Sequence, residues 1–181
     1  MPVLATYAAA DPRPGRQTVY LVWQDTRFSG GVADAVVLSR SDDAGRTWSE
    51  PVQVSPATGV QAFTPAVTVD WLGRVTVVYY DFTYDTATDP LETDLWLTRS
   101  FNGGRNFQPR QRITPSSFDM RAAPAVSRGF FVGDNPGITR AGTQVFTLYS
   151  NSQVHFPGSV TGPHASEPHL DPAATGRRSP V

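Results

Sequence analysis

The chain has 181 residues, enough for one domain with a sizeable core and short for two. Its formal net charge of -1 gives no electrostatic reason to expect a nucleic-acid partner or an anionic membrane. The absence of Cys excludes disulfides and thiol chemistry.

The opening residues, "MPVLATYAAADPRPG", do not have the pattern of a secretory signal peptide. No apolar run along the chain approaches the length that a membrane span needs. The sequence therefore predicts neither a signal peptide within it nor a membrane-spanning segment.

The predicted strands come in groups of four, separated by Gly, Asp, Asn and Pro. In the complete group they cover 65–71, 74–80, 94–99 and about 106–113, where Val, Tyr, Thr and Trp are frequent. Gly73 suits a tight hairpin between the first two, because glycine tolerates a positive φ. No segment has helical periodicity, and 16 Pro and 15 Gly argue against long helices. The sequence predicts an all-β fold.

The groups recur at a nearly constant spacing. "DAVVLSRSDDAGRTWSEPVQVSP" (34–56) aligns with "TDLWLTRSFNGGRNFQPRQRITP" (93–115), so that Ser41 falls on Ser100, 59 positions later. Upstream, "TVYLVWQDT" aligns with "RVTVVYYDF", and Asp25 falls on Asp81. Four-stranded units that repeat about every 60 residues predict blades of a β-propeller. A plain β-sandwich is the alternative, but it does not predict a fixed repeat.

We predict one propeller segment over residues 1–155 and a Pro-rich, disordered tail over 156–181. The units within the segment cover about 2–56, 63–115 and 123–150, and the last of them is incomplete. About two and a half units leave open sheet edges, which soluble proteins normally cover. The chain is therefore expected to self-associate or to bind the remaining blades of a parent protein.

The stretch "SDDAGRTW" (41–48) fits the pattern S-x-D-x-G-x-T-W at every specified position. Asp43 can accept hydrogen bonds from backbone N–H groups of its own turn, and Trp48 is expected to bury its indole between neighbouring sheets. The second copy, "SFNGGRNF" (100–107), has Asn102 in place of the Asp, and a catalytic carboxylate could not be replaced in that way. We interpret the motif residues of both copies as structural: Ser41, Asp43, Gly45, Thr47, Trp48, Ser100, Asn102, Gly104 and Phe107.

This motif resembles the Asp-box of sialidases and related BNR-repeat β-propellers, and the resemblance covers about residues 1–150. It implies a partial sialidase-like propeller with an extracellular or cell-envelope location. It also implies that the box turns face away from the substrate, so that any chemistry lies in the loops at the opposite end of the strands. These loops cover residues 24–34, 55–63, 81–94 and 114–123.

Asp25, in "WQDTR", resembles the sialidase Asp that acts as general acid/base, the group that protonates the leaving oxygen of a glycoside. Asp81 occupies the equivalent position in the next unit, so a repeated structural residue is the alternative. The sialidase motif Phe-Arg-Ile-Pro is absent, and no Tyr–Glu nucleophile pair can be assigned. The candidate substrate-binding residues in these loops are Arg27, Asp81, Tyr84 and Arg121.

Two functions follow from these patterns. The first is a non-catalytic Asp-box propeller scaffold, or a fragment of a larger propeller, that binds a glycan or protein ligand. The alternative is an exo-sialidase-like glycoside hydrolase that is active only with the missing blades and uses Asp25 as general acid/base. We predict no cofactor; the acidic loop 81–94 offers oxygen ligands for Ca²⁺, with a solvated loop as the alternative.

Overall fold

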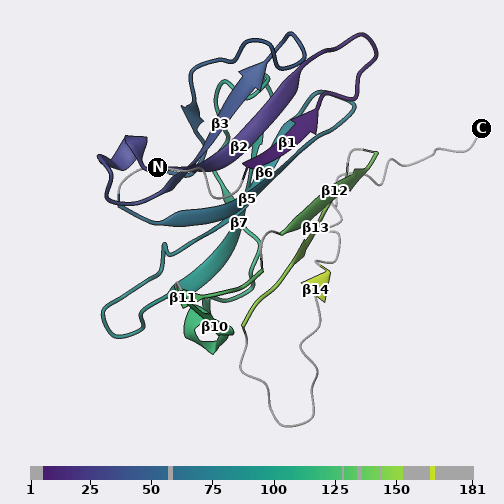
Figure 1. Cartoon of the computed structure of the whole chain (residues 1–181). Coiled ribbons are helices and arrows are strands. Elements are labelled where there is room, and N and C mark those ends of the chain that lie inside the picture. The colour runs from purple at the N-terminus through teal and green to yellow at the C-terminus, as the bar shows by residue number, and fades with distance from the viewer. Residues whose placement is uncertain are drawn as a thin grey trace, which may run out of the picture.

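The structure is a computed structural model that describes residues 6–56, 59–127, 129–133, 136–142, 144–152 and 164–165. These residues form antiparallel sheets and two single-turn 3-10 helices, η1 (Arg27–Ser29) and η2 (Met120–Ala122), and none of them is in an α-helix. Figure 1 shows the arrangement. The prediction of an all-β fold is confirmed. No helix among the described residues has the length and apolarity that crossing a membrane requires.

The first sheet has the order β1-β2-β3-β4. Its strands are β1 (Thr6–Ala10), β2 (Val19–Asp25), β3 (Ala35–Ser41) and β4 (Val52–Gln53). Because neighbours in the sheet are also neighbours along the chain, the sheet is an up-and-down meander of the kind that the four-strand pattern predicts.

The second sheet repeats this order with β5 (Ala62–Val69), β6 (Val75–Asp81), β7 (Glu92–Ser100) and β8 (Gln111–Arg112). A further short strand, β9 (Phe118–Asp119), pairs with the start of β7. The fourth strand is shorter than the predicted 106–113. The box turn and the extended chain after it occupy most of that range, and the N–H of Gln108 donates to the carbonyl of Arg99 at 2.8 Å before the ladder to β8 begins.

The β5–β6 hairpin is held by one side chain. Oδ1 of Asp70 accepts hydrogen bonds from the N–H groups of Leu72 and Arg74, each at 2.9 Å. Gly73 has a φ of 78°, the left-handed conformation that the turn requires and that glycine adopts without strain. Local chemistry therefore fixes this turn, as the sequence predicts.

The remaining strands form a hairpin and a third sheet. The hairpin is β10 (Ala125–Val126) with β11 (Gly129–Phe130), and the sheet is β12 (Gly137–Ala141), β13 (Gln144–Tyr149) and β14 (His164–Ala165). β14 pairs with Leu148 and Tyr149 and comes from the predicted tail. The other residues of the predicted tail, 156–163 and 166–181, lie outside the described residues.

The second sheet is buried on both faces, because every residue of β6 is buried. Successive side chains of a strand point to opposite faces. Val77 and Tyr79 accordingly pack in one apolar cluster with Tyr20 and Leu38 of the first sheet. The alternate residues, Val78 and Tyr80, pack in a second cluster, with Phe118, Val132 and Tyr149. In Figure 1 the second sheet lies between the first sheet and the β12–β13 hairpin.

The strands of the first two sheets run between two sides of the molecule, at which they end and the chain turns. We call these sides edges, which here are not the unpaired outer strands of a sheet. The turns after β3 and β7 lie together at one of them, here called the box edge, where Nη1 of Arg40 donates to the carbonyl of Gly103 at 3.3 Å. β2 and β6 end at the opposite edge, the loop edge, where the N–H of Ala62 donates to the carbonyl of Asp34 at 2.8 Å. The predicted structural and functional residues therefore lie on opposite edges.

Candidate functional site

The first box turn is closed by side-chain hydrogen bonds. Oδ1 of Asp43 accepts from the Ser41 hydroxyl and from the N–H of Thr47, each at 2.8 Å, and Oδ2 accepts from the Thr47 hydroxyl at 2.6 Å. The Ser41 hydroxyl oxygen in turn accepts from the N–H of Gly45 at 2.8 Å. Both carboxylate oxygens of Asp43 therefore accept hydrogen bonds from residues of its own turn.

The second turn repeats this geometry with an amide. Oδ1 of Asn102 accepts from the Ser100 hydroxyl at 2.9 Å and from the N–H of Asn106 at 3.2 Å. Its Nδ2 donates to Oδ1 of Asn106 at 2.8 Å, where the first turn has a hydroxyl donating to the carboxylate. The Ser100 hydroxyl oxygen accepts from the N–H of Gly104 at 2.9 Å. The second turn therefore closes without a negative charge.

The expectation that Trp48 is buried between sheets is wrong, because 40% of this residue is exposed. Its indole N–H donates to the carbonyl of Gly45 at 3.1 Å. Phe107, at the same position in the second turn, packs on the apolar cluster between the first two sheets. Among the described residues no sheet packs on the corresponding side of the first sheet, so the same motif position is covered in one unit and open in the other.

Asp25 lies at the loop edge, where both of its carboxylate oxygens accept hydrogen bonds. Its Oδ1 accepts from the N–H of Arg27 at 2.9 Å, and its Oδ2 accepts from Trp23 Nε1 at 3.0 Å and from Arg27 Nε at 2.8 Å. Burial acts to raise the pKa of Asp25, but these hydrogen bonds and the charge of Arg27 outweigh it and hold the pKa below its ordinary value. The structure thus brings together two of the predicted site residues, Asp25 and Arg27, as an ion pair.

Asp81 is equivalent to Asp25 along the chain and is only 1% exposed. It accepts hydrogen bonds from Trp96 Nε1 at 2.7 Å, from the N–H of Thr83 at 3.0 Å and from Arg110 Nη1. The Arg110 guanidinium lies over the Trp96 ring, 3.8 Å from its centroid, and also donates to the Thr83 hydroxyl at 2.7 Å. Asp81 is therefore buried and paired with Arg110, and it is not accessible to a ligand.

Tyr84 packs beside Trp96, on the solvent-exposed side of the Asp81, Arg110 and Trp96 cluster. Its ring centroid lies 6.1 Å from that of Trp96, and the Arg112 guanidinium lies 4.9 Å from the Tyr84 ring centroid. Arg112 Nε donates to Oδ1 of the fully buried Asp94 at 2.7 Å. The resulting stack runs Arg110, Trp96, Tyr84, Arg112, and Tyr84 is 48% exposed at its surface. We call these four residues the loop-edge stack.

The sequence reasoning missed Arg110 and Arg112. The available signal was "RQR" (110–112), where two arginines alternate at the fourth strand of the unit and so point to the same face. The first unit has Pro51 and Gln53 at these positions, so the repeat alignment concealed the pair rather than revealing it.

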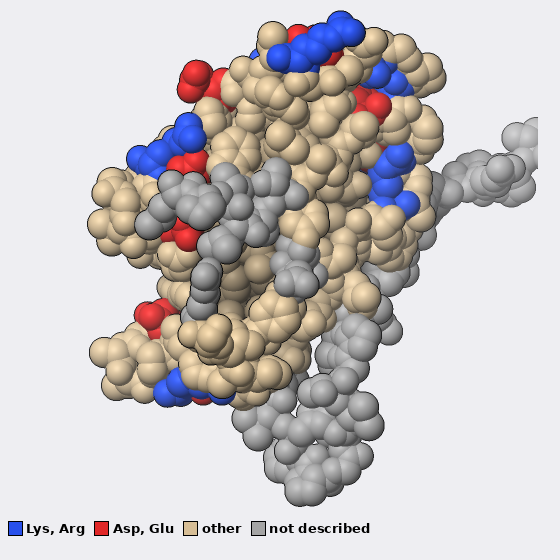
Figure 2. Space-filling model, in the orientation of Figure 1, with Lys and Arg blue, Asp and Glu red and all other residues tan. Residues whose placement is uncertain are grey.

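Arg121 forms a separate pair at the loop edge. Its Nε donates to both carboxylate oxygens of Asp119, at 2.8 and 3.0 Å, and both side chains are substantially exposed. Glu92 pairs with Asp119 across β7 and β9. Burial raises the pKa of Glu92, and the negative charges of Asp119 and Asp89 act in the same direction. On the surface shown in Figure 2, positive and negative side chains adjoin at several places.

The acidic loop 81–94 is organised by its own turns. Asp85 Oδ1 accepts from the N–H of Leu91 at 2.6 Å, and the N–H of Asp89 donates to the Thr86 hydroxyl at 3.0 Å. Among the described residues, no three His, Asp or Glu side chains are grouped so that they could hold a metal ion.

A polar cluster joins the first two sheets at the loop edge. Asp34 Oδ2 accepts from the amides of Gln24 at 3.4 Å and Gln61 at 2.8 Å, and the N–H of Asp34 donates to Gln61 Oε1 at 2.9 Å. Gln24 Oε1 accepts from the N–H of Thr64 at 3.2 Å. Thr64 has a φ of 43° and a buried hydroxyl without a hydrogen-bond partner. A β-branched residue in this conformation is strained.

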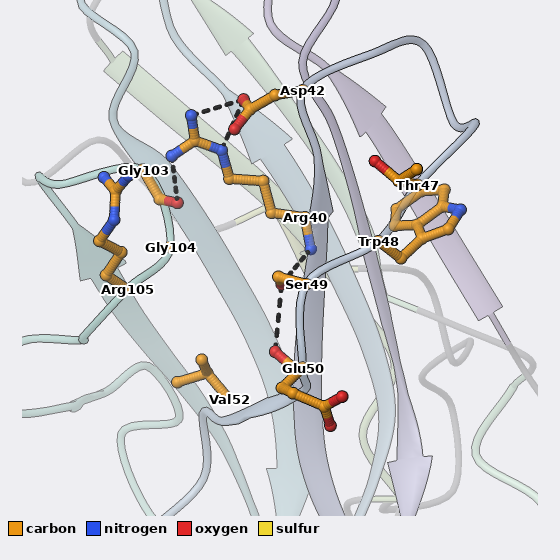
Figure 3. A pocket seen from close by; sticks show the side chains of 10 residues that line it. All are labelled: Arg40, Asp42, Thr47, Trp48, Ser49, Glu50, Val52, Gly103, Gly104 and Arg105. Atoms are coloured by element: carbon orange, nitrogen blue, oxygen red, sulfur yellow. Dashed lines mark hydrogen bonds and ion pairs between the residues drawn. The ribbon is translucent and has the colours of Figure 1, made fainter.

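The box edge carries an open cleft of about 550 Å³ between the two box turns (Figure 3). Arg40, Glu50, Val52 and Arg105 line it. Nε and Nη2 of Arg40 both donate to Asp42, at 2.8 and 2.5 Å, so the guanidinium that crosses the cleft is already paired.

Comparisons with solved structures find distant neighbours, including the following two. A protein of unknown function from Dyadobacter fermentans is 19% identical with a TM-score of 0.49, covering 73% of this chain and 30% of that chain. The Hadza microbial sialidase Hz136 is 15% identical with a TM-score of 0.46, covering 80% of this chain and 28% of that chain. The chain thus spans less than a third of the length of either. No family model and no curated protein matches it.

Proposed function

We propose that this chain is a segment of an Asp-box β-propeller that binds a glycan and does not hydrolyse it. Two successive four-stranded meanders with the same strand order support the propeller interpretation, as do the two box turns with matching hydrogen bonds. The face-to-face packing of a sheet that is buried on both sides also fits blades in a row.

The hydrogen bonds and the lowered pKa of Asp25 support the proposal that the chain does not hydrolyse the glycan. A glycosidase acid must hold a proton at working pH, which requires a raised pKa. The pKa of Asp25 is instead lowered, and its two oxygens already accept three hydrogen bonds. Asp81, its counterpart, is buried under Arg110. At the loop edge Asp25 and Asp81 are each paired with an arginine, an arrangement that suits neither of them to act as a general acid or a free nucleophile.

The loop-edge stack supports the binding part. A sugar ring offers apolar C–H faces and a rim of hydroxyl groups, so it needs a flat apolar surface beside hydrogen-bonding groups. Tyr84 supplies a half-exposed ring held in place by Trp96 and Arg112. Arg112, with 30% of its side chain exposed, adds charged N–H donors beside that ring.

Binding of a panel of neutral and acidic oligosaccharides, measured by calorimetry or on an array, tests this function. We expect binding to wild type and its loss in Tyr84→Ala. Phe101→Ala is the matched control, because Phe101 is also an exposed aromatic residue, at 60%, but lies at the box edge. No binding to any oligosaccharide, or equal binding by wild type and Tyr84→Ala, would overturn the proposal.

The same protein is then assayed with fluorogenic sialosides and other glycosides. The proposal predicts no release of the fluorophore. Release that is lost in Asp25→Asn would establish the hydrolase alternative, and Glu92→Gln tests the one described carboxyl group whose pKa is raised.

A further inference from the structure

One face of the second sheet is built to pack against the first sheet. It presents apolar side chains from β5, β6, β7 and the box turn, and these pack in the cluster between the two sheets. They are Val67, Val69, Val75, Val77, Tyr79, Trp96 and Phe107. On the first sheet they meet the opposite face, which includes Tyr20, Val22 and Leu38.

Strand pairing gives the equivalent positions of the first sheet. Val77 of β6 pairs with Val67 of β5 and Thr98 of β7. Leu21 of β2 pairs in the same way with Ala8 of β1 and Ser39 of β3, so Leu21 is the counterpart of Val77. The same correspondence gives one counterpart in the first unit for each of the seven residues named above. All of these counterparts are apolar: Ala8, Ala10, Val19, Leu21, Trp23, Val37 and Trp48. We call this set the front face.

The front face has the composition of the buried interface but, apart from the fully buried Val37, it is at least partly exposed. Trp48 is 40% exposed, Ala8 and Ala10 are exposed, and Leu21 and Trp23 are partly exposed. Val77 and Tyr79, the counterparts of Leu21 and Trp23, are fully buried. In Figure 3 the Trp48 indole points away from Arg40 and Arg105, the side on which the second box turn lies. Among the described residues, no sheet packs on the front face.

The third sheet also exposes apolar side chains, on the face that points away from the second sheet. On β13, Val145 and Tyr149 pack in the cluster toward the second sheet. Phe146 and Leu148 alternate with them and so point away from that sheet. Leu148 is 46% exposed, and Phe146 is partly exposed. We call Phe146 and Leu148 the rear face.

We propose that the front face of one copy of this chain packs on the rear face of a second copy. Within the chain the second sheet packs one face on the first sheet, and Val145 and Tyr149 of β13 pack on its opposite face. A second copy placed head to tail continues this order, and it covers both exposed apolar surfaces at once. The proposal rests on the repeat of sheet packing and not on glycan binding, so either can fail alone.

Light scattering coupled to size exclusion tests the proposal with Trp48→Glu and Leu148→Glu. Wild type should elute as multiples of 19.7 kDa, and each variant alone as a 19.7 kDa monomer. Both positions are exposed, so both variants should retain the far-UV spectrum and a cooperative melt. An equimolar mixture should form a complex of twice the monomer mass, because an intact front face then meets an intact rear face.

Phe101→Glu, on an exposed residue of the box edge, is the control and should assemble like wild type. A wild type that stays monomeric at all concentrations would overturn the proposal. So would assembly by Leu148→Glu alone, which indicates front-to-front pairing, or a mixture of the two variants that remains monomeric. If either glutamate variant fails to fold, Trp48→Ser and Leu148→Ser replace the pair in the same mixing experiment.

Discussion

The carboxylate of Asp43 accepts two hydrogen bonds from Thr47, one from its backbone N–H at 2.8 Å and one from its hydroxyl at 2.6 Å. Asn102 and Asn106 hold the same relationship in the second turn, at 3.2 and 2.8 Å, with the direction of the side-chain bond reversed. An uncharged amide therefore closes the second turn at the position where the first turn has a carboxylate.

Asp43→Ala should lower the melting temperature, because the N–H of Thr47 and the hydroxyls of Ser41 and Thr47 then lose their acceptor. Asp43→Asn should retain most of the stability, as Asn102 does in its own turn. Thermal melts of the three proteins measure this. Equal melting temperatures for wild type and Asp43→Ala would contradict the structural role of the turn.

The advantage of Asp43 over asparagine should depend on pH. The hydrogen bonds from the Thr47 hydroxyl and N–H and from Ser41 lower the pKa of Asp43 from 3.8 to about 2. A group whose pKa is depressed on folding stabilises the fold above its unfolded pKa and loses that contribution as the pH falls toward the folded pKa. The difference in melting temperature between wild type and Asp43→Asn should therefore be constant above about pH 5 and shrink between pH 4 and 2. A difference that stays constant down to pH 2 would argue against the shift.

Arg110→Met should destabilise the protein by about 3–5 kcal/mol, because it leaves the carboxylate of Asp81 buried without its counter-charge. Adding Asp81→Asn to Arg110→Met should recover part of the loss, since the buried charge is then gone. Arg121→Met is the matched control: its pair with Asp119 is exposed, so the melting temperature should stay near that of wild type. Chemical denaturation measures all three, and similar losses for Arg110 and Arg121 would refute this account.

Val77→Ala and Val78→Ala should each cost about 1–3 kcal/mol of unfolding free energy. These neighbours point to opposite faces of β6, and both are fully buried, one in each apolar cluster. In a sheet with one solvated face only one of the two would be costly. An effect confined to Val77 would mean that the second apolar cluster is not packed on the second sheet in solution.

Thr64→Gly should leave stability unchanged or raise it by up to about 1 kcal/mol, because glycine removes both the left-handed strain and the unpaired buried hydroxyl. Thr68→Gly is the control on the same strand at an ordinary position, and it should lower the stability. A loss from Thr64→Gly as large as that from Thr68→Gly would show that the conformation of Thr64 carries no strain.

The sequence by itself determined the features that rest on neighbours along the chain. The box turns and the Asp70 hairpin are closed by contacts two to four residues apart, so residue types at fixed spacing are sufficient to specify them. The strand order within each of the first two sheets follows from the same logic, because short turns make successive strands pair.

Tertiary structure alone decided which side chains from distant parts of the chain share a site. Arg110 reaches Asp81 across 29 residues, and Gln24 reaches Thr64 across 40, since the register of β8 and the packing of two sheets bring them together. Trp48 shows the same limit: its motif position is identical to that of Phe107, yet only Phe107 has a sheet packed against it among the described residues. Burial depends on what lies across a sheet face, and no local pattern encodes whether that neighbour is present.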